Sequence, residues 1–258
     1  AGPTEQIPAT APKAGEPFEV LLYIHGFASS LYESTLPFGQ LLALADLPAR
    51  IKPFIFSWPC GSYLSYYAAK RAAMSAEVGK DLAEVMQSLK EAGATAIHVI
   101  AYSLGAQLLL SAVPHISHLF LSCNDAPRKP GEPPESVGCF GGASKSEGSL
   151  KMATCMLMSP DTPLESFVND YYYSLRAICD CITLYADEQD VALAIAEFFN
   201  RTKGLSRYPF ALVAPPEISK PDPADLEETD ILPPMPFDTR RTKQEETALD
   251  IDVINTSF

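Results

Sequence analysis

Short apolar runs recur along the chain, and a segment with helical spacing follows most of them. Continuous apolar runs of this length are typical of strands that are buried on both faces, as in a parallel sheet. The runs comprise residues 19–24, 51–57, 96–101, 152–159, 181–185 and 250–254. The helical segments comprise residues 41–47, 63–92, 105–113, 164–178 and 191–200. This alternation predicts an α/β fold, in which a mainly parallel sheet is covered by helices on both faces.

Three segments interrupt this pattern. Residues 1–16 are rich in Pro, Ala and Gly, which is typical of a flexible lead-in. Residues 124–149 form a Pro/Gly/Ser-rich stretch that is too long for an ordinary connector, so we expect a lid or a disordered insertion. Residues 214–246 combine many prolines and acidic residues and should lack regular structure. We expect residues 17–258 to form a single domain that contains the second and third of these segments.

The charge balance excludes some partners. The chain has 19 basic and 32 acidic residues, which gives a net charge of −13. Like charges repel during encounter, so nucleic acid is not an expected partner. No apolar run approaches the roughly 18 residues of a membrane helix, so we expect no transmembrane segment and favour a cytoplasmic location. The oligomeric state is left open.

Six cysteines in 258 residues are too few for a disulfide scaffold, and we expect buried free thiols. Cys179 and Cys181 alternate within an apolar run and should share one face of a strand. A less favoured interpretation is a zinc site formed by mixed His and Cys ligands, although their spacing matches no compact zinc motif. Those ligands would be His115, His118, Cys123 and Cys139.

The sharpest local motif is Ala-Tyr-Ser-Leu-Gly at residues 101–105, between a β-branched apolar strand and an apolar helix. A nucleophile elbow requires this context, because its serine occupies a strained strand-to-helix turn and small flanking residues let the strand and helix approach. The motif predicts Ser103 as a nucleophile. The backbone N–H of Leu104 should then face the oxyanion at the N-terminus of a helix. Ala101 replaces the first glycine of the usual pattern.

A second motif upstream supports the first. The apolar run of residues 21–24 ends in His25-Gly26-Phe27. In enzymes with a nucleophile elbow, the loop after such a strand supplies the second oxyanion donor. We therefore expect His25 to fix the loop and the Phe27 N–H to point at the developing charge.

With these motifs the chain resembles an α/β-hydrolase family known as domain of unknown function 900, which is distantly lipase- or esterase-like. The segments that carry the resemblance are YIHGF (23–27), FSWPCGSYLSY (56–66), VIAYSLGAQLLL (99–110), MSPDTPLESF (158–167) and YADEQDVALAIA (185–196). They occur in the family's order over most of residues 20–200. The resemblance implies an α/β-hydrolase fold with a serine nucleophile.

The chain departs from the family pattern in three places. Tyr102 and Leu104 flank the serine where the family usually has His and Met, and residues 67–70 lack an aspartate that is normal there. Gln107 stands where Asn is common. These differences indicate a diverged branch that retains the nucleophile.

An enzyme of this fold uses a catalytic triad of a serine, an acidic residue and a histidine. The acidic residue should follow the nucleophile in the chain and lie just past a late strand. Asp190 matches the family position and is our preferred acid. Asp187 in the same loop and Asp161, which follows the preceding strand, remain the alternatives.

A serine needs a base to take its proton, and in this fold a histidine after the acid does so. All four histidines of the chain precede residue 119: they are His25, His98, His115 and His118. In the resembling family the base follows a terminal strand similar to residues 251–257. We therefore expect the base to lie beyond residue 258 rather than to have been lost, and the 258-residue chain to be only feebly active on activated esters.

Two functions stay open from the sequence. The first is a carboxylic ester hydrolase that attacks a small-molecule ester or thioester through an acyl-serine intermediate, with no cofactor and no metal. The second is an inactive hydrolase fold that serves in binding or as a scaffold.

Overall fold

The computed structural model describes residues 17–61, 65–123, 149–200, 202–208, 212 and 249–257. Within this part, six strands form one sheet in the order β2-β1-β3-β4-β5-β6, and every neighbouring pair is parallel. The strands are β1 (Phe18–Ile24), β2 (Ile51–Phe56), β3 (Ala94–Tyr102), β4 (Lys151–Met158), β5 (Cys179–Ala186) and β6 (Asp252–Asn255). Each predicted strand is confirmed, with ends that differ by at most two residues.

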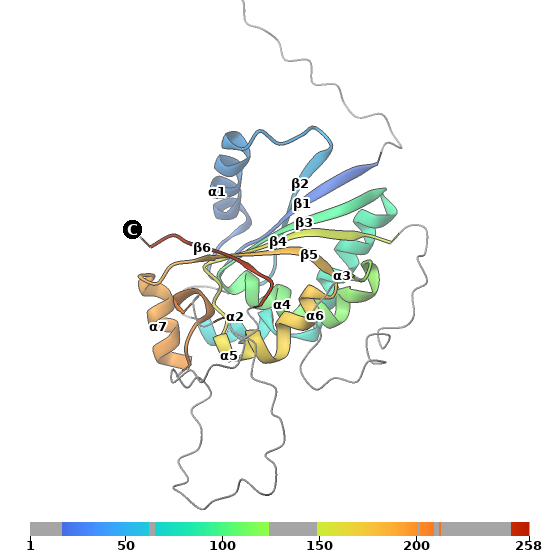
Figure 1. Cartoon of the computed structure of the whole chain (residues 1–258). Helices are drawn as coiled ribbons and strands as arrows, with labels where there is room; N and C mark the ends of the chain where they lie inside the picture. Colours follow the sequence, from blue (N-terminus) through green and yellow to red (C-terminus); the bar gives the residue numbers. More distant parts are fainter. Residues whose placement is uncertain are drawn as a thin grey trace, which may run out of the picture.

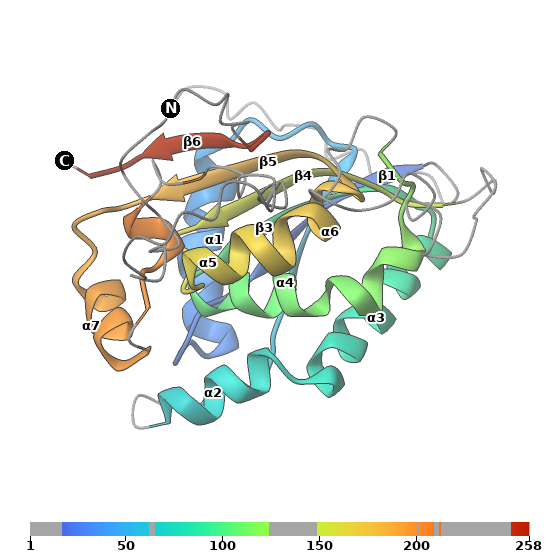
Figure 2. The same ribbon diagram turned by 60° about the horizontal axis from the view of Figure 1, so that its bottom comes forward.

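Helices lie on both sides of this sheet (Figures 1 and 2). Helix α1 (Leu31–Leu44) covers one face, and helices α2 to α6 lie on the other. These are α2 (Tyr66–Ala73), α3 (Ala76–Glu91), α4 (Leu104–Ile116), α5 (Leu164–Ser166) and α6 (Tyr172–Arg176). Helix α7 (Val191–Asn200) follows β5. The predicted α/β architecture is therefore confirmed.

The two faces have cores of different size. The face under α4 carries the main core, in which Leu22, Val99, Leu108 and Leu157 are completely buried. The α1 face carries a small cluster in which Tyr23 stacks on Phe38 at a ring distance of 5.0 Å. The fold is thus held mainly by the helices on the α4 side.

Helix α1 is longer than predicted. We expected a short helix over residues 41–47, whereas α1 begins ten residues earlier, at Leu31, and ends at Leu44. Ser30 and Glu33 form a reciprocal capping box, in which each side chain accepts from the other's backbone N–H. Pro37 lies inside the helix, where its missing N–H argues against helix in a sequence pattern. The capping signal is the one that prevails.

We expected one helix over residues 63–92; residues 63 and 64 lie outside the described residues, and the rest forms two helices. It breaks between α2 and α3, where the Ser75 side chain accepts from the Val78 N–H and caps α3. The helix predicted over residues 164–178 is continuous but changes type. It passes from α5 through a π-helical turn η3 (Phe167–Tyr171) into α6.

The cysteines of the described segments carry free thiols. Cys60, Cys155 and Cys179 are buried, whereas Cys123 and Cys181 are partly exposed. Cys179 and Cys181 both lie in β5, two residues apart, as the predicted strand requires; Cys179 packs in the main core, whereas Cys181 does not.

No group of three or more His, Cys, Asp or Glu side chains in the described segments could hold a metal ion. Cys139 of the zinc hypothesis lies outside these segments, as do residues 1–16, 213–248 and all but one residue of the 124–149 stretch. No helix of the described chain combines the length and apolarity of a membrane span.

Candidate active site

Ser103 lies at the turn between β3 and α4, at the carboxyl end of a strand flanked by β1 and β4. Its φ of 52° and ψ of −120° place a non-glycine residue in a sparsely populated region, which costs about 1–3 kcal/mol. Such strain persists only where surrounding contacts hold it. The Ser103 N–H donates to the Met158 carbonyl at 2.9 Å, and its carbonyl accepts from the N–H groups of Ala106 and Asp161. The strained turn is therefore fixed from both α4 and the end of β4.

Two glycines let this turn approach the end of β1. A Cβ at Gly105 would lie 2.5 Å from the carbonyl oxygens of His25 and Ile24. A Cβ at Gly26 would lie 3.0 Å from the Ser103 Cβ. The motifs at residues 23–27 and 101–105 thus meet in space, and each has glycine at the point of contact.

The two predicted oxyanion donors lie beside this contact. Leu104 is the first residue of α4, and the first N–H groups of a helix have no intrahelical acceptor. Phe27 directly follows Gly26, whose Cα faces Ser103. The Phe27 ring packs edge-to-face against Tyr66 at a centroid distance of 5.5 Å. The structure therefore brings the Phe27 loop next to Ser103, which itself precedes the N-terminus of α4.

His25 occupies the interior of the Phe27 loop and is only 1% exposed. Its Nδ1 is 3.0 Å from the Gly26 carbonyl, and its Nε2 accepts from the Trp58 N–H at 3.4 Å. The Trp58 indole Nε1–H in turn donates to the His25 carbonyl at 2.9 Å, and the two rings stack. Burial lowers the pKa of His25, with a smaller opposing effect from its bond to Gly26. A neutral His25 that donates through Nδ1 satisfies these contacts, so this residue anchors the loop.

Asp161 is the buried carboxylate of the site. It follows β4, is 8% exposed, and accepts a hydrogen bond from the Tyr66 hydroxyl at 2.8 Å. Burial raises the pKa of this carboxyl above its usual value. Lys70 and the Tyr66 hydrogen bond oppose that rise, whereas the negative charge of Asp190 adds to it.

Asp190 lies on the same edge of the sheet, in the loop after β5. One carboxylate oxygen accepts from the Leu193 N–H at 2.9 Å and caps α7. Burial raises the pKa of Tyr102, the residue before the nucleophile, and the negative charge of Asp190 raises it further. The Asp190 charge thus acts on both Tyr102 and Asp161.

Asp187 is directed elsewhere. Its Oδ1 accepts from the Gln189 N–H at 2.8 Å and from the Ser257 hydroxyl at 3.2 Å. These bonds tie the β5 loop to the residues after β6. Asp187 is thus engaged in joining two loops.

The other three histidines lie away from Ser103. His98 is in the middle of β3, between Thr154 Oγ1 at 2.9 Å and Glu19 Oε2 at 3.1 Å. His115 packs on α3, where a Cβ at Gly79 would lie 2.6 Å from its ring. His118 follows the far end of α4. Within the described chain, His25 is the histidine nearest to Ser103 along the sheet edge.

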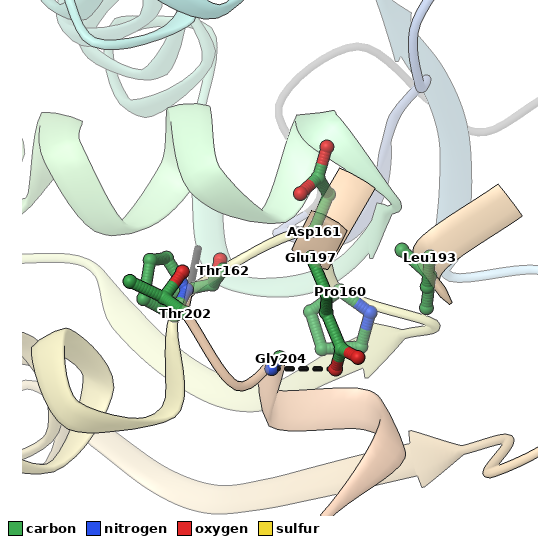
Figure 3. A pocket seen from close by; sticks show the side chains of 8 residues that line it. Pro160, Asp161, Thr162, Leu193, Glu197, Thr202 and Gly204 are labelled. Carbon is green, nitrogen blue, oxygen red and sulfur yellow. Dashed lines mark hydrogen bonds between the residues drawn. The ribbon is translucent and has the colours of Figure 1, made fainter. Parts of the chain in front are cut away.

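A small cavity of about 10 Å³ lies behind Asp161, between the β4–α5 connection and α7 (Figure 3). Its lining includes Asp161, Thr162, Leu193 and Glu197. The Thr162 hydroxyl is buried and has no hydrogen-bond partner among the described residues. A space of this size accommodates about one water molecule.

A sequence model of the family described as alpha/beta hydrolase of unknown function (DUF900) matches residues 9–207. The chain belongs to this family. A search among curated proteins found no match. The strand order and the β3–α4 turn agree with the α/β-hydrolase description, and the five segments quoted above from residues 23–196 lie inside the matched range. The resemblance to DUF900 is therefore confirmed.

Sequence reasoning missed the Tyr66–Asp161 pair. The two residues are 95 positions apart, and no local pattern links them. Both nevertheless lie in segments that carry the DUF900 resemblance, residues 56–66 and 158–167. The presence of both residues in these segments was the only indication in the sequence that they belong to one site.

Proposed function

We propose that this member of DUF900 is a serine hydrolase that cleaves a carboxylic ester or thioester through an acyl-Ser103 intermediate. The observation that carries the proposal is the strained conformation of Ser103 at the N-terminus of α4. Strain of this kind is retained where it serves a mechanism, because a relaxed turn would be more stable. It holds the serine hydroxyl at the end of a central strand, where a substrate carbonyl could be attacked.

In the proposed reaction the Ser103 oxygen attacks the carbonyl carbon and its proton passes to a base. The new C–O bond pushes the carbonyl electrons onto oxygen, and the N–H groups of Phe27 and Leu104 stabilise that oxyanion. Collapse expels the alcohol or thiol, which takes the proton from the base. Water then releases the acid by the same steps. Asp190 is the proposed triad acid that orients the base.

The acid assignment draws on the surroundings of the three candidates. Asp187 is bonded to the residues after β6, and Asp161 is bonded to Tyr66. Among the described residues the Asp190 carboxylate accepts one hydrogen bond, from the Leu193 N–H, which leaves it room to orient a base. The family position favours the same residue.

The test is hydrolysis of nitrophenyl acetate and of a nitrophenyl thioester by the full-length natural protein. Ser103→Ala should remove nearly all turnover, because members of a catalytic triad act as a unit. Ser88→Ala, on the surface of α3, is the matched control and should leave the rate unchanged. The alternative of an inactive binding or scaffold protein predicts no turnover that depends on Ser103.

A further inference from the structure

We propose that Asp161 is a positioning residue that couples the Ser103 turn to the Phe27 oxyanion loop through Tyr66. This inference rests on the proposed function and names a part of the site that neither the family description nor the motifs assign. Asp161 follows β4, the strand next to the one that ends at Ser103. It contacts the Ser103 turn and also Tyr66, which packs on Phe27. Its two contacts come from different atoms and can be separated by mutation.

The first contact is made by the backbone. The Asp161 N–H donates to the Ser103 carbonyl at 3.2 Å, and the Met158 carbonyl accepts from the Ser103 N–H at 2.9 Å. The segment of residues 158–161 therefore holds both backbone polar groups of the strained residue. Movement of Asp161 would be transmitted directly to the nucleophile.

The second contact is made by the carboxylate. The Tyr66 hydroxyl donates to Asp161 Oδ2 at 2.8 Å, and the Tyr66 ring packs edge-to-face on Phe27. Tyr66 begins α2, and the Lys70 ammonium lies 5.9 Å from its ring centre, one helical turn later. A path of direct contacts thus runs from the Ser103 backbone through Asp161 and Tyr66 to the residue proposed as oxyanion donor.

The burial of Asp161 is a further argument. Removing a carboxylate from water costs free energy. The Asp161 side chain is only 8% exposed, so specific contacts must offset that cost. Its acceptor oxygen fixes the Tyr66 hydroxyl, and a fixed Tyr66 sets the position of the Phe27 ring. Oxyanion donors act only when they are placed in advance, so a small displacement of this loop lowers the rate.

The test compares Asp161→Ala, Asp161→Asn and Tyr66→Phe in the full-length natural protein, with kcat and KM measured separately. We expect Asp161→Ala to lower kcat by about 10- to 100-fold with little change in KM, because a misplaced oxyanion loop weakens the transition state more than substrate binding. Asp161→Asn keeps an acceptor for the Tyr66 hydroxyl and should recover most of the rate. Tyr66→Phe should reproduce the Asp161→Ala defect.

The double variant Asp161→Ala/Tyr66→Phe distinguishes coupling from two separate effects. If the two residues are coupled, the double variant loses no more kcat than either single variant. If they act independently, its fold-loss in kcat is the product of the two single fold-losses. Thermal unfolding of each variant excludes loss of the fold as the cause.

Three results would overturn the inference: full activity in Tyr66→Phe, multiplicative defects, or an Asp161→Asn variant as impaired as Asp161→Ala. The last would assign the charge itself a role and make Asp161 the triad acid, for which a loss of about 10⁴-fold is expected. Failure of the proposed function is a different outcome, since wild-type protein would then show no turnover that Ser103→Ala removes.

Discussion

Gly105 at the start of α4 lies directly against His25 at the end of β1, so that a Cβ on Gly105 would be 2.5 Å from the His25 carbonyl oxygen. That carbonyl belongs to the backbone and cannot move aside as a flexible side chain could. We therefore expect Gly105→Ala to lower the free energy of unfolding by more than about 2 kcal/mol, through overpacking. Urea denaturation measures the change.

Gly39 inside α1 is the matched control for this substitution. A Cβ there would meet nothing within 4 Å. Gly39→Ala should therefore raise the free energy of unfolding by about 0.5–1 kcal/mol, because alanine has the higher helix propensity. Equal effects of the two substitutions would contradict the close approach of α4 to β1.

The stability of the protein should depend on pH through His25. Burial lowers its pKa in the folded state, so below pH 6.5 the unfolded state binds the proton first. The stability that neutral His25 contributes is then complete above pH 6.5 and is lost as the pH falls from 6.5 through the folded pKa. The free energy of unfolding, measured by urea between pH 8 and 5, should show this loss in the wild type but not in His25→Asn.

The exposed His118 provides the control for that experiment. His118→Gln should keep the same loss of stability below pH 6.5, because His25 remains. A wild-type profile that is flat from pH 8 to 5 would contradict a buried neutral His25.

Asp161 should affect stability in the opposite direction. Burial raises its pKa in the folded state, so the unfolded chain loses its proton first, at the usual value near 3.8. The contribution of Asp161 to stability is therefore most favourable below pH 3.8, falls as the pH rises to the folded pKa, and stays reduced above it. We expect Asp161→Asn to unfold at a higher temperature than the wild type at pH 7, with a difference that shrinks below pH 4. A constant difference over the whole range would be inconsistent with the raised pKa.

Relief of strain at Ser103 gives a fourth prediction. Glycine adopts a φ of 52° without steric cost, whereas alanine retains the strain. Ser103→Gly should therefore be more stable than Ser103→Ala by about 1 kcal/mol, even though both remove the hydroxyl. Thermal unfolding of the pair at neutral pH measures this. A less stable Ser103→Gly would mean that the turn is relaxed.

The strands could be read from the sequence because burial on both faces produces apolar runs of the right length. Residues 94–102 and 151–158 became β3 and β4 nearly as expected. The position of the site followed from the same pattern, since parallel strands bring their carboxyl ends to one edge of the sheet. The motifs after β1 and β3 therefore had to be neighbours.

The helices were harder to predict because local signals compete. Pro37 obscured α1, while the capping box at Ser30 fixed where it starts. Residues 63–92 were predicted as one helix from apolar spacing that lies wholly within residues 78–89, and the Ser75 side chain starts a new helix just before them. Tertiary packing on the sheet decides such cases, and a single sequence does not reveal it.

The contacts of Asp161 lay beyond sequence reasoning for a different reason. Asp161 and Asp190 both follow strands, and both could be acids of the site. Only the fold brings Tyr66, on helix α2, against Asp161. Such a pair depends on where α2 packs relative to β4, and no spacing along the chain encodes that.

The most direct test of Ser103 as nucleophile is covalent labelling by a fluorophosphonate, followed by intact-mass and peptide mass spectrometry of the full-length natural protein. A serine activated in an elbow reacts through its oxygen, expels fluoride and keeps the phosphonyl group, whereas ordinary surface serines do not react. We predict a single adduct on the peptide that contains Ser103, and no adduct in Ser103→Ala. Absence of labelling in the wild type, or the same adduct in Ser103→Ala, would contradict the account.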